Sequence, residues 1–164
     1  VPGEQPVWDR LEDRLLAKRT LNPKTEETGT FGVAETDLPL KERAFEGGSI
    51  KTGDVPDPTY KPPTDFPRAQ GHAEQNILGR LKAAIQEAGL DKIEGSMQGK
   101  KVWILVDQEV CTTCRIGTYA DILQDGKPSG VLKQFSTDHR DLTIEVTDWL
   151  HGKVWRLRGG KLVP

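Results

Sequence analysis

The chain has 164 residues and a mass of 18.2 kDa, with a net charge of −2 and a pI of about 6.0. This length suits one domain with a substantial core, and the near-neutral charge gives no general indication of nucleic-acid binding. The sequence has no apolar run of about 18 residues and no signal-peptide pattern, so it predicts neither a transmembrane helix nor a leader. Because the chain begins with Val1, we expect residues 1–164 to be one domain of a longer protein or a processed product.

The first part of the chain predicts a helix, a strand and a long loop. Residues 28–34 read as a strand softened by glycine, and residues 47–68 are rich in Gly, Pro, Asp and Thr. A loop as long as residues 47–68 tends to be functional or disordered. Residues 6–19 predict a short amphipathic helix, whose apolar stripe is Trp8, Leu11, Leu15 and Leu16.

Residues 73–88 predict a second helix, because apolar side chains recur there at steps of three and four. Gly89 stands where a left-handed C-terminal cap belongs. The apolar run 101–107 then predicts a buried central strand. A further helix is expected to begin at Cys111, close behind the end of that strand.

The last part of the chain predicts a short helix and a hairpin. The helix begins at Val131, and residues 142–149 alternate apolar and polar side chains as a half-buried strand does. Residues 153–158 return as the final strand. The connection between these two strands is so short that they must pair antiparallel.

Four residues with metal chemistry stand at the starts of the two central helices. His72 and Glu74 belong to the first helix start, and Cys111 and Cys114 to the second. One imidazole and two thiolates leave the fourth tetrahedral position of Zn²⁺ open, as catalytic zinc sites do. Zinc lowers the pKa of a bound water toward neutrality, and a nearby carboxylate can move the proton. The sequence therefore predicts a catalytic zinc site where these helix starts meet the carboxyl end of the central strand.

The two cysteines alone permit other interpretations. A C-x-x-C pair near such a pattern is also typical of a redox dithiol, and it can form a local disulfide. It can also be half of a structural zinc site, with His139 or His151 as the fourth ligand. The preceding H-x-E at a helix start favours the catalytic site.

An H-x-E at a helix start, then a strand, then C-x-x-C at the next helix start resembles the cytidine deaminase superfamily over roughly residues 70–160. The superfamily signature has Pro before the first Cys, where this chain has Val110. With the final hairpin, this departure makes the chain most similar to deaminase domains of bacterial polymorphic toxins that act on single-stranded DNA. The resemblance implies a three-layer α/β fold, in which a five-stranded mixed sheet has helices on both faces and its last two strands form an antiparallel hairpin.

The resemblance also implies a function. Zinc would be held by His72, Cys111 and Cys114, with Glu74 as the proton shuttle that converts cytosine to uracil in single-stranded DNA. The domain would be the C-terminal part of a secreted effector, monomeric and without membrane contact, that acts in the cytoplasm of a target cell. A cognate immunity protein would inhibit it. The alternatives are a deaminase of RNA, adenine or free nucleotides, and a structural zinc module that binds a protein.

Seven residues are candidates for contacts to the substrate. The two aromatic residues of the long loop would stack on a base or anchor the loop, and the two residues beside the metal motifs would contact the base or brace the ligands. The three residues of the last strand would hold flanking nucleotides or form an ordinary solvated face. In chain order the candidates are Tyr60, Phe66, Asn76, Thr112, Trp155, Arg156 and Arg158.

Overall fold

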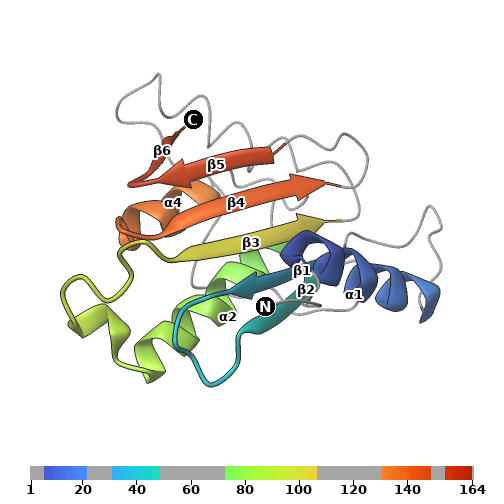
Figure 1. The fold of residues 1–164 in the computed structure, drawn as a ribbon, viewed down its shortest axis with the longest axis horizontal. Helices are drawn as coiled ribbons and strands as arrows, with labels where there is room; N and C mark the ends of the chain where they lie inside the picture. The colour runs from blue at the N-terminus through green and yellow to red at the C-terminus, as the bar shows by residue number, and fades with distance from the viewer. Residues whose placement is uncertain (1–5, 22–30, 49–72, 107–130, 149–153, 164) are drawn as a thin grey trace, which may run out of the picture.

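The structure is a computed structural model that describes residues 6–21, 31–48, 73–106, 131–148 and 154–163 (Figure 1). All strands in these ranges belong to one sheet. In chain order the elements are α1 (Val7–Leu21), β1 (Phe31–Thr36), β2 (Ala44–Gly48), α2 (Ala73–Glu87), the 3-10 helix η3 (Leu90–Lys92), β3 (Lys101–Val106), α4 (Val131–Asp138), β4 (Thr143–Asp148), β5 (Val154–Arg158) and β6 (Lys161–Leu162).

The sheet is mixed, with the strand order β2-β1-β3-β4-β5-β6. β3 and β4 pair in parallel, and the other neighbours pair antiparallel. This confirms the predicted α/β class with a mixed sheet. The predicted hairpin is also confirmed, because β4 and β5 pair antiparallel with Ile144 opposite Leu157. The sequence did not predict β2 or the two-residue β6.

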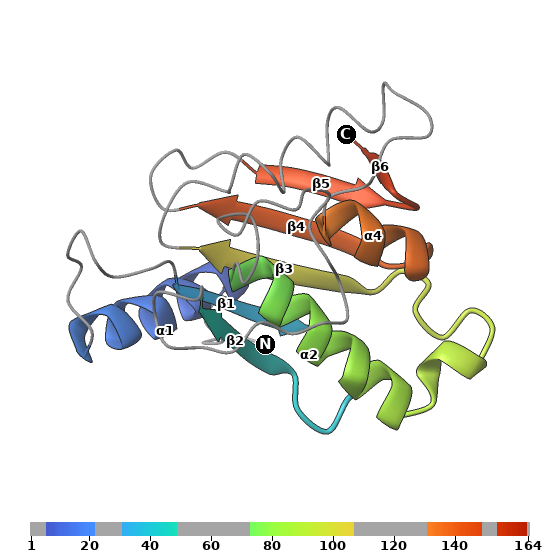
Figure 2. The same ribbon diagram turned by 180° about the vertical axis from the view of Figure 1, so that it is seen from behind.

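Helices lie on both faces of this sheet. α1 packs on one face, over β1 and β3, whereas α2 and α4 pack on the other face (Figures 1 and 2). Side chains alternate between the two faces along each strand. The larger core lies on the α2 side and includes Ile104, Ile144 and Leu157, while a smaller cluster on the α1 side includes Val33 and Leu105.

α1 contacts the sheet through a narrow stripe. Leu11 and Leu15 are fully buried and Trp8 packs beside them, as predicted. The prediction for Leu16 is wrong, because this side chain is 49% exposed. One helical residue turns the side chain by about 100° from its neighbour, so a helix lying on a sheet buries Leu15 and leaves Leu16 in solvent.

α2 forms as its sequence pattern predicts. Ile77, Leu78, Leu81 and Ile85 are fully buried against the sheet and α4, which accounts for the apolar spacing. Gly89 follows the helix with a φ of 72°, the left-handed conformation that favours glycine at a helix end. The predicted extent of this helix is therefore confirmed. No helix in the described ranges has the length and apolar character needed to cross a membrane.

Candidate catalytic site at the carboxyl ends of the parallel strands

The strand register brings several strand ends to one edge of the sheet. Val106 and Asp148, the last residues of β3 and β4, are paired, and Val106 also pairs with Gly32 at the start of β1. Phe31 in turn pairs with Gly48, the last residue of β2. The carboxyl ends of the two parallel strands and the end of β2 therefore lie together, which is where ligands bind in many α/β sheets. We call this the site edge.

α2 begins at the same edge. The side chain of Asn76, in the second turn of α2, is fully buried, and its Nδ2 donates a hydrogen bond of 2.8 Å to the backbone oxygen of Gly48. Glu74 lies in the first turn of α2, as predicted. The positive end of the helix dipole is thus at the site edge, where it favours anionic ligands such as thiolates.

The predicted zinc ligands His72, Cys111 and Cys114 lie outside the described residues, as do Tyr60, Phe66, Thr112 and His151. Within the described ranges, no group of three His, Cys, Asp or Glu side chains could hold a metal ion. The zinc site therefore stays a prediction, and the structure contributes the position of the backbone around Glu74.

The buried amide of Asn76 has a hydrogen-bond partner. A buried amide that donates to a backbone oxygen satisfies a polar group that would otherwise be costly to bury. The observed bond joins α2 to β2, and the two roles predicted for Asn76, contact with the base or bracing of the metal ligands, stay predictions.

The candidates on the last strand face in different directions. Trp155 is 6% exposed and belongs to the larger core, so it does not share a surface with the two arginines. Arg156 lies on the α1 face and pairs with Glu145 at 3.4 Å, while Arg158 is exposed at the end of β5 remote from the site edge. The strip of alternating cationic and aromatic side chains predicted to hold nucleotides is therefore split between two faces.

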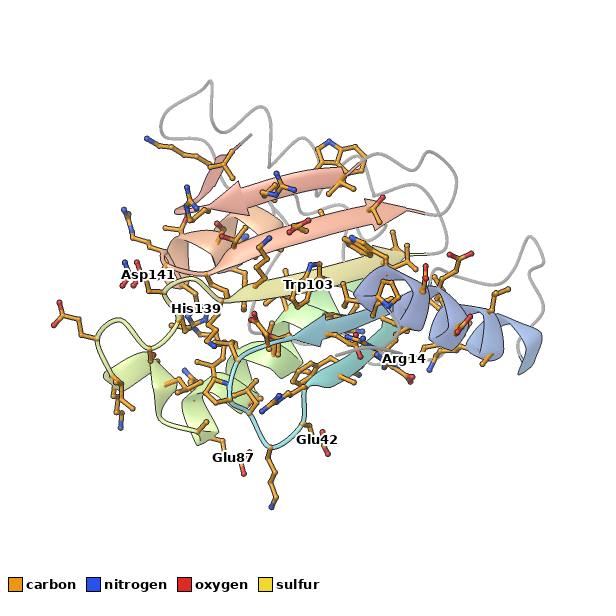
Figure 3. All side chains as sticks on the ribbon, viewed as in Figure 1. Arg14, Glu42, Glu87, Trp103, His139 and Asp141 are labelled. Atoms are coloured by element: carbon orange, nitrogen blue, oxygen red, sulfur yellow. The ribbon has the colours of Figure 1, made fainter. Side chains whose placement is uncertain are left out.

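Glu145 is the buried charge of the α1 face. Its side chain is 8% exposed and lies between two cations, with Oε2 3.1 Å from Lys101 Nζ and Oε1 3.4 Å from Arg156 Nη2. Trp103 is its neighbour on β3 and packs toward α1 (Figure 3). Because the carboxylate is paired with a cation on each side, we interpret Glu145 as a structural residue.

His139 lies at the other end of the sheet from the site edge. It follows α4, and its ring centroid is 4.7 Å from that of Phe135; Figure 3 labels it. Burial and the nearby charge of Lys82 lower the pKa of His139 to about 4, although Asp138 and Asp91 act in the opposite direction. Its ring is therefore neutral at pH 7.

The position of His139 bears on the structural-zinc alternative. Asp138, its neighbour in the chain, pairs with Lys82 at 3.2 Å. Lys82 is eight residues after Glu74 on α2, which corresponds to about 12 Å along the helix axis. This separation weighs against His139 as the fourth ligand of a metal at the start of α2.

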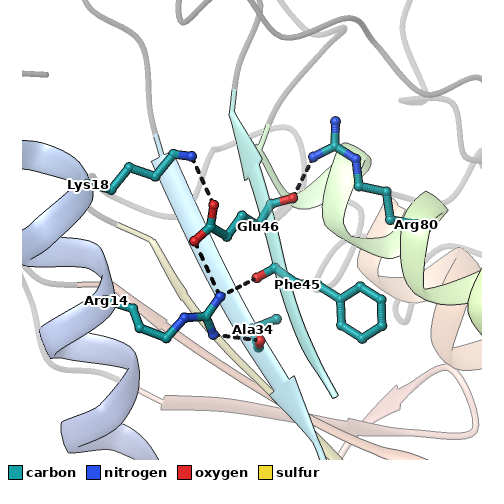
Figure 4. A network of polar contacts seen from close by, with 6 residues as sticks. All are labelled: Arg14, Lys18, Ala34, Phe45, Glu46 and Arg80. Carbon is teal, nitrogen blue, oxygen red and sulfur yellow. Dashed lines mark hydrogen bonds and ion pairs between the residues drawn. The ribbon is translucent and has the colours of Figure 1, made fainter. Parts of the chain in front are cut away.

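Sequence reasoning missed the charged network that joins α1, β2 and α2 (Figure 4). Glu46 on β2 accepts hydrogen bonds from Lys18 at 3.0 Å and Arg14 at 3.4 Å, and its backbone oxygen accepts one from Arg80. Burial alone would raise the pKa of Glu46, but the bond and charge of Lys18, and the charge of Arg14, hold it below 4.5. The four-residue spacing of Arg14 and Lys18 is a weak signal that α1 turns cations toward an acidic partner.

No family model matches this chain, and no curated protein matches it.

Proposed function

We propose that the protein is a zinc-dependent cytosine deaminase that converts cytosine to uracil in single-stranded DNA. The single observation that supports this proposal is that the first turn of α2, with Glu74, and the carboxyl end of β3 share one edge of the sheet.

Chain connectivity relates this edge to the proposed ligands. His72 directly precedes α2, and Cys111 is five residues after Val106, the last residue of β3. Five residues span at most about 18 Å even when fully extended. His72 is thus attached to the start of α2 and Cys111 to the end of β3, and these two points lie at the same edge of the sheet. Two ligands of one metal ion must be close together in this way.

The proposed ligand set fits zinc by its chemistry. One imidazole and two thiolates are common zinc donors, and three protein ligands leave a position for water. His72, Cys111 and Cys114 would hold the ion, and zinc when bound would supply a water that loses its proton near neutral pH.

The chain's own contribution to the reaction is proton transfer by Glu74. In the proposed hydrolysis, the Glu74 carboxylate takes a proton from water and delivers it to N3 of cytosine as the water oxygen bonds to C4. Glu74 then takes the proton of the new C4 hydroxyl and delivers it to the exocyclic amino group. The bond between C4 and that amino nitrogen breaks as the C4 carbonyl forms, so that uracil and ammonia leave. A single strand is the simplest polymeric substrate, because the target base must be unstacked to reach such a site.

The biological setting is part of the proposal. A deaminase of DNA would mutate the cell that makes it, so it fits a secreted effector that acts in the cytoplasm of a target cell. A cognate immunity protein that covers the site edge would protect the producer. A monomer would suffice, because every proposed site residue belongs to one chain.

The test is uracil formation in a cytosine-containing single-stranded DNA oligonucleotide incubated with the zinc-loaded protein. Glu74→Ala should lower the rate by at least about 100-fold, since general acid–base catalysis contributes that much or more, while zinc content stays the same. Glu87→Ala is the matched control, because Glu87 is exposed at the other end of α2.

Three outcomes would contradict the proposal in different ways. Undiminished deamination by Glu74→Ala with zinc intact would remove the role of Glu74. A zinc-loaded wild type that deaminates RNA, adenine or free nucleotides, and not the oligonucleotide, would replace the substrate class. Bound zinc without any deamination would favour a structural zinc module.

A further inference from the structure

Two side chains of α2 bind the backbone of the edge strand β2. Asn76 Nδ2 donates to the backbone oxygen of Gly48 at 2.8 Å, and Arg80 Nη1 donates to the backbone oxygen of Glu46 (Figure 4). The first contact is buried and the second is at the surface. We call the pair the α2–β2 clamp.

The spacing of the clamp matches on the two elements. Asn76 and Arg80 are one helical turn apart, about 6 Å along the axis. Gly48 and Glu46 are two strand residues apart, about 6.6 Å along β2. The residue number rises along α2 as it falls along β2, so α2 runs beside the strand in the opposite direction and both contacts form in one register.

The clamp defines the position of α2 along its own axis, which the apolar contacts alone do not define. Ile77 and Leu78, between the two contacts, and Leu81, just after them, are fully buried, but the hydrophobic effect is not directional and allows a helix to slide or rotate slightly. Hydrogen bonds weaken steeply when distance or angle changes. The clamp therefore sets the position of α2 along its own axis.

We propose that Asn76 and Arg80 are positioning residues that hold the first turn of α2, and with it Glu74, at the site edge. This inference rests on the proposed function, since it assigns to Asn76 and Arg80 the placement of the proton shuttle. Neither residue touches the reacting atoms. Displacement of a reacting group by about 1 Å can cost on the order of 100-fold in rate, so an otherwise folded variant with a loose first turn would lose activity.

The experiment compares kcat and KM for the single-stranded oligonucleotide among four variants of the zinc-loaded protein. Asn76→Leu removes the buried donor at similar volume, Arg80→Met removes the surface donor, and Arg80→Lys keeps a donor of similar reach. Lys82→Met is the matched control, because it removes an ion pair of the same helix, with Asp138, away from the site edge.

We expect Asn76→Leu to lower kcat about 10- to 100-fold with little change in KM, as loss of supporting contacts around a catalytic group does. Arg80→Met should lower kcat less, and Arg80→Lys should restore most of it. Lys82→Met should keep the wild-type kcat. Amide hydrogen exchange gives a second readout, because the amides of Ile77 and Leu78 close the first turn of α2. Both clamp variants should speed exchange at these two amides, whereas Lys82→Met should not.

The outcomes separate this inference from the proposed function. If the wild type deaminates and Asn76→Leu and Arg80→Met keep its kcat, the inference is wrong and the function stands. If the wild type deaminates no nucleobase, the proposed deaminase function is wrong. The exchange rates then still test whether Asn76 and Arg80 hold the first turn of α2 in place. Unchanged exchange in both clamp variants overturns the inference in either case.

Discussion

On one face of the sheet, β3, β4 and β5 turn apolar side chains toward α2 and α4, and these form the larger core. On the other face, beyond the part that α1 covers, Glu145 pairs with both Lys101 and Arg156 on the neighbouring strands. Stability therefore depends mostly on packing on the α2 face. The α1 face has the smaller apolar cluster under α1, and beyond it depends on charge pairing, which contributes less.

The largest expected effect compares two neighbours on β4 that point to opposite faces. Ile144 is fully buried on the α2 face, so Ile144→Ala should lower the free energy of unfolding by about 2–5 kcal/mol through lost burial and a cavity. Thr143 points to the α1 face and is also buried, but its side chain is smaller, so Thr143→Ala should cost less, on the order of 1 kcal/mol. Urea unfolding of both variants measures the difference. Equal costs would mean that the two faces do not differ as described.

The next largest effect is expected from the protonation of His139, which tests whether the α2 side of the sheet tolerates a buried charge. The pKa of His139 is about 4 in the folded protein, mainly through burial, against about 6.5 in an unfolded chain. Between these values the unfolded state takes up a proton that the folded state does not, so stability is full above pH 6.5 and falls as the pH drops toward 4. The loss from pH 7 to 4.5 should be on the order of 2 kcal/mol.

His139→Leu should remove most of this pH dependence. The comparison is made by urea unfolding at pH 7 and pH 4.5. A variant that keeps the full wild-type pH dependence would show that another group causes it.

The smallest effect concerns the charges of the α1 face. Glu145→Gln keeps the shape of the side chain and removes the charge between Lys101 and Arg156, both of which are partly exposed. The cost should be about 1 kcal/mol and should shrink at high salt, because salt screens half-exposed pairs. A double-mutant cycle with Arg156→Met isolates the pair. Coupling of the size expected for a fully buried pair, several kcal/mol, would contradict the comparison.

The elements with long periodic patterns could be predicted from the sequence. α2, β3 and the β4–β5 hairpin form where apolar spacing and chain punctuation indicate. β2 could not be predicted, because Ala44–Gly48 is short, ends in two glycines and is stabilised by contacts with Arg14, Arg80 and Asn76 from distant parts of the chain. Tertiary contacts of this kind leave no local signal.

The candidate site was predictable in part for a similar reason. The helix start at Glu74 follows from local pattern and is confirmed. The surface role of Trp155 was read from its cationic neighbours, although the period of two along a strand turns it away from Arg156 and Arg158. The buried position of Asn76 depends on the end of β2, which the sequence does not reveal.

The α2–β2 clamp has a consequence for how this domain meets other chains. An outer strand exposes backbone groups that can template a strand from another molecule, which leads to aggregation or to partner binding by strand addition. Along β2, the oxygens of Glu46 and Gly48 are already occupied by Arg80 and Asn76. The opposite edge ends in β6, which has only two residues. Within the described strands, these two oxygens of β2 are thus not available to an incoming strand, and β6 alone is too short to template one.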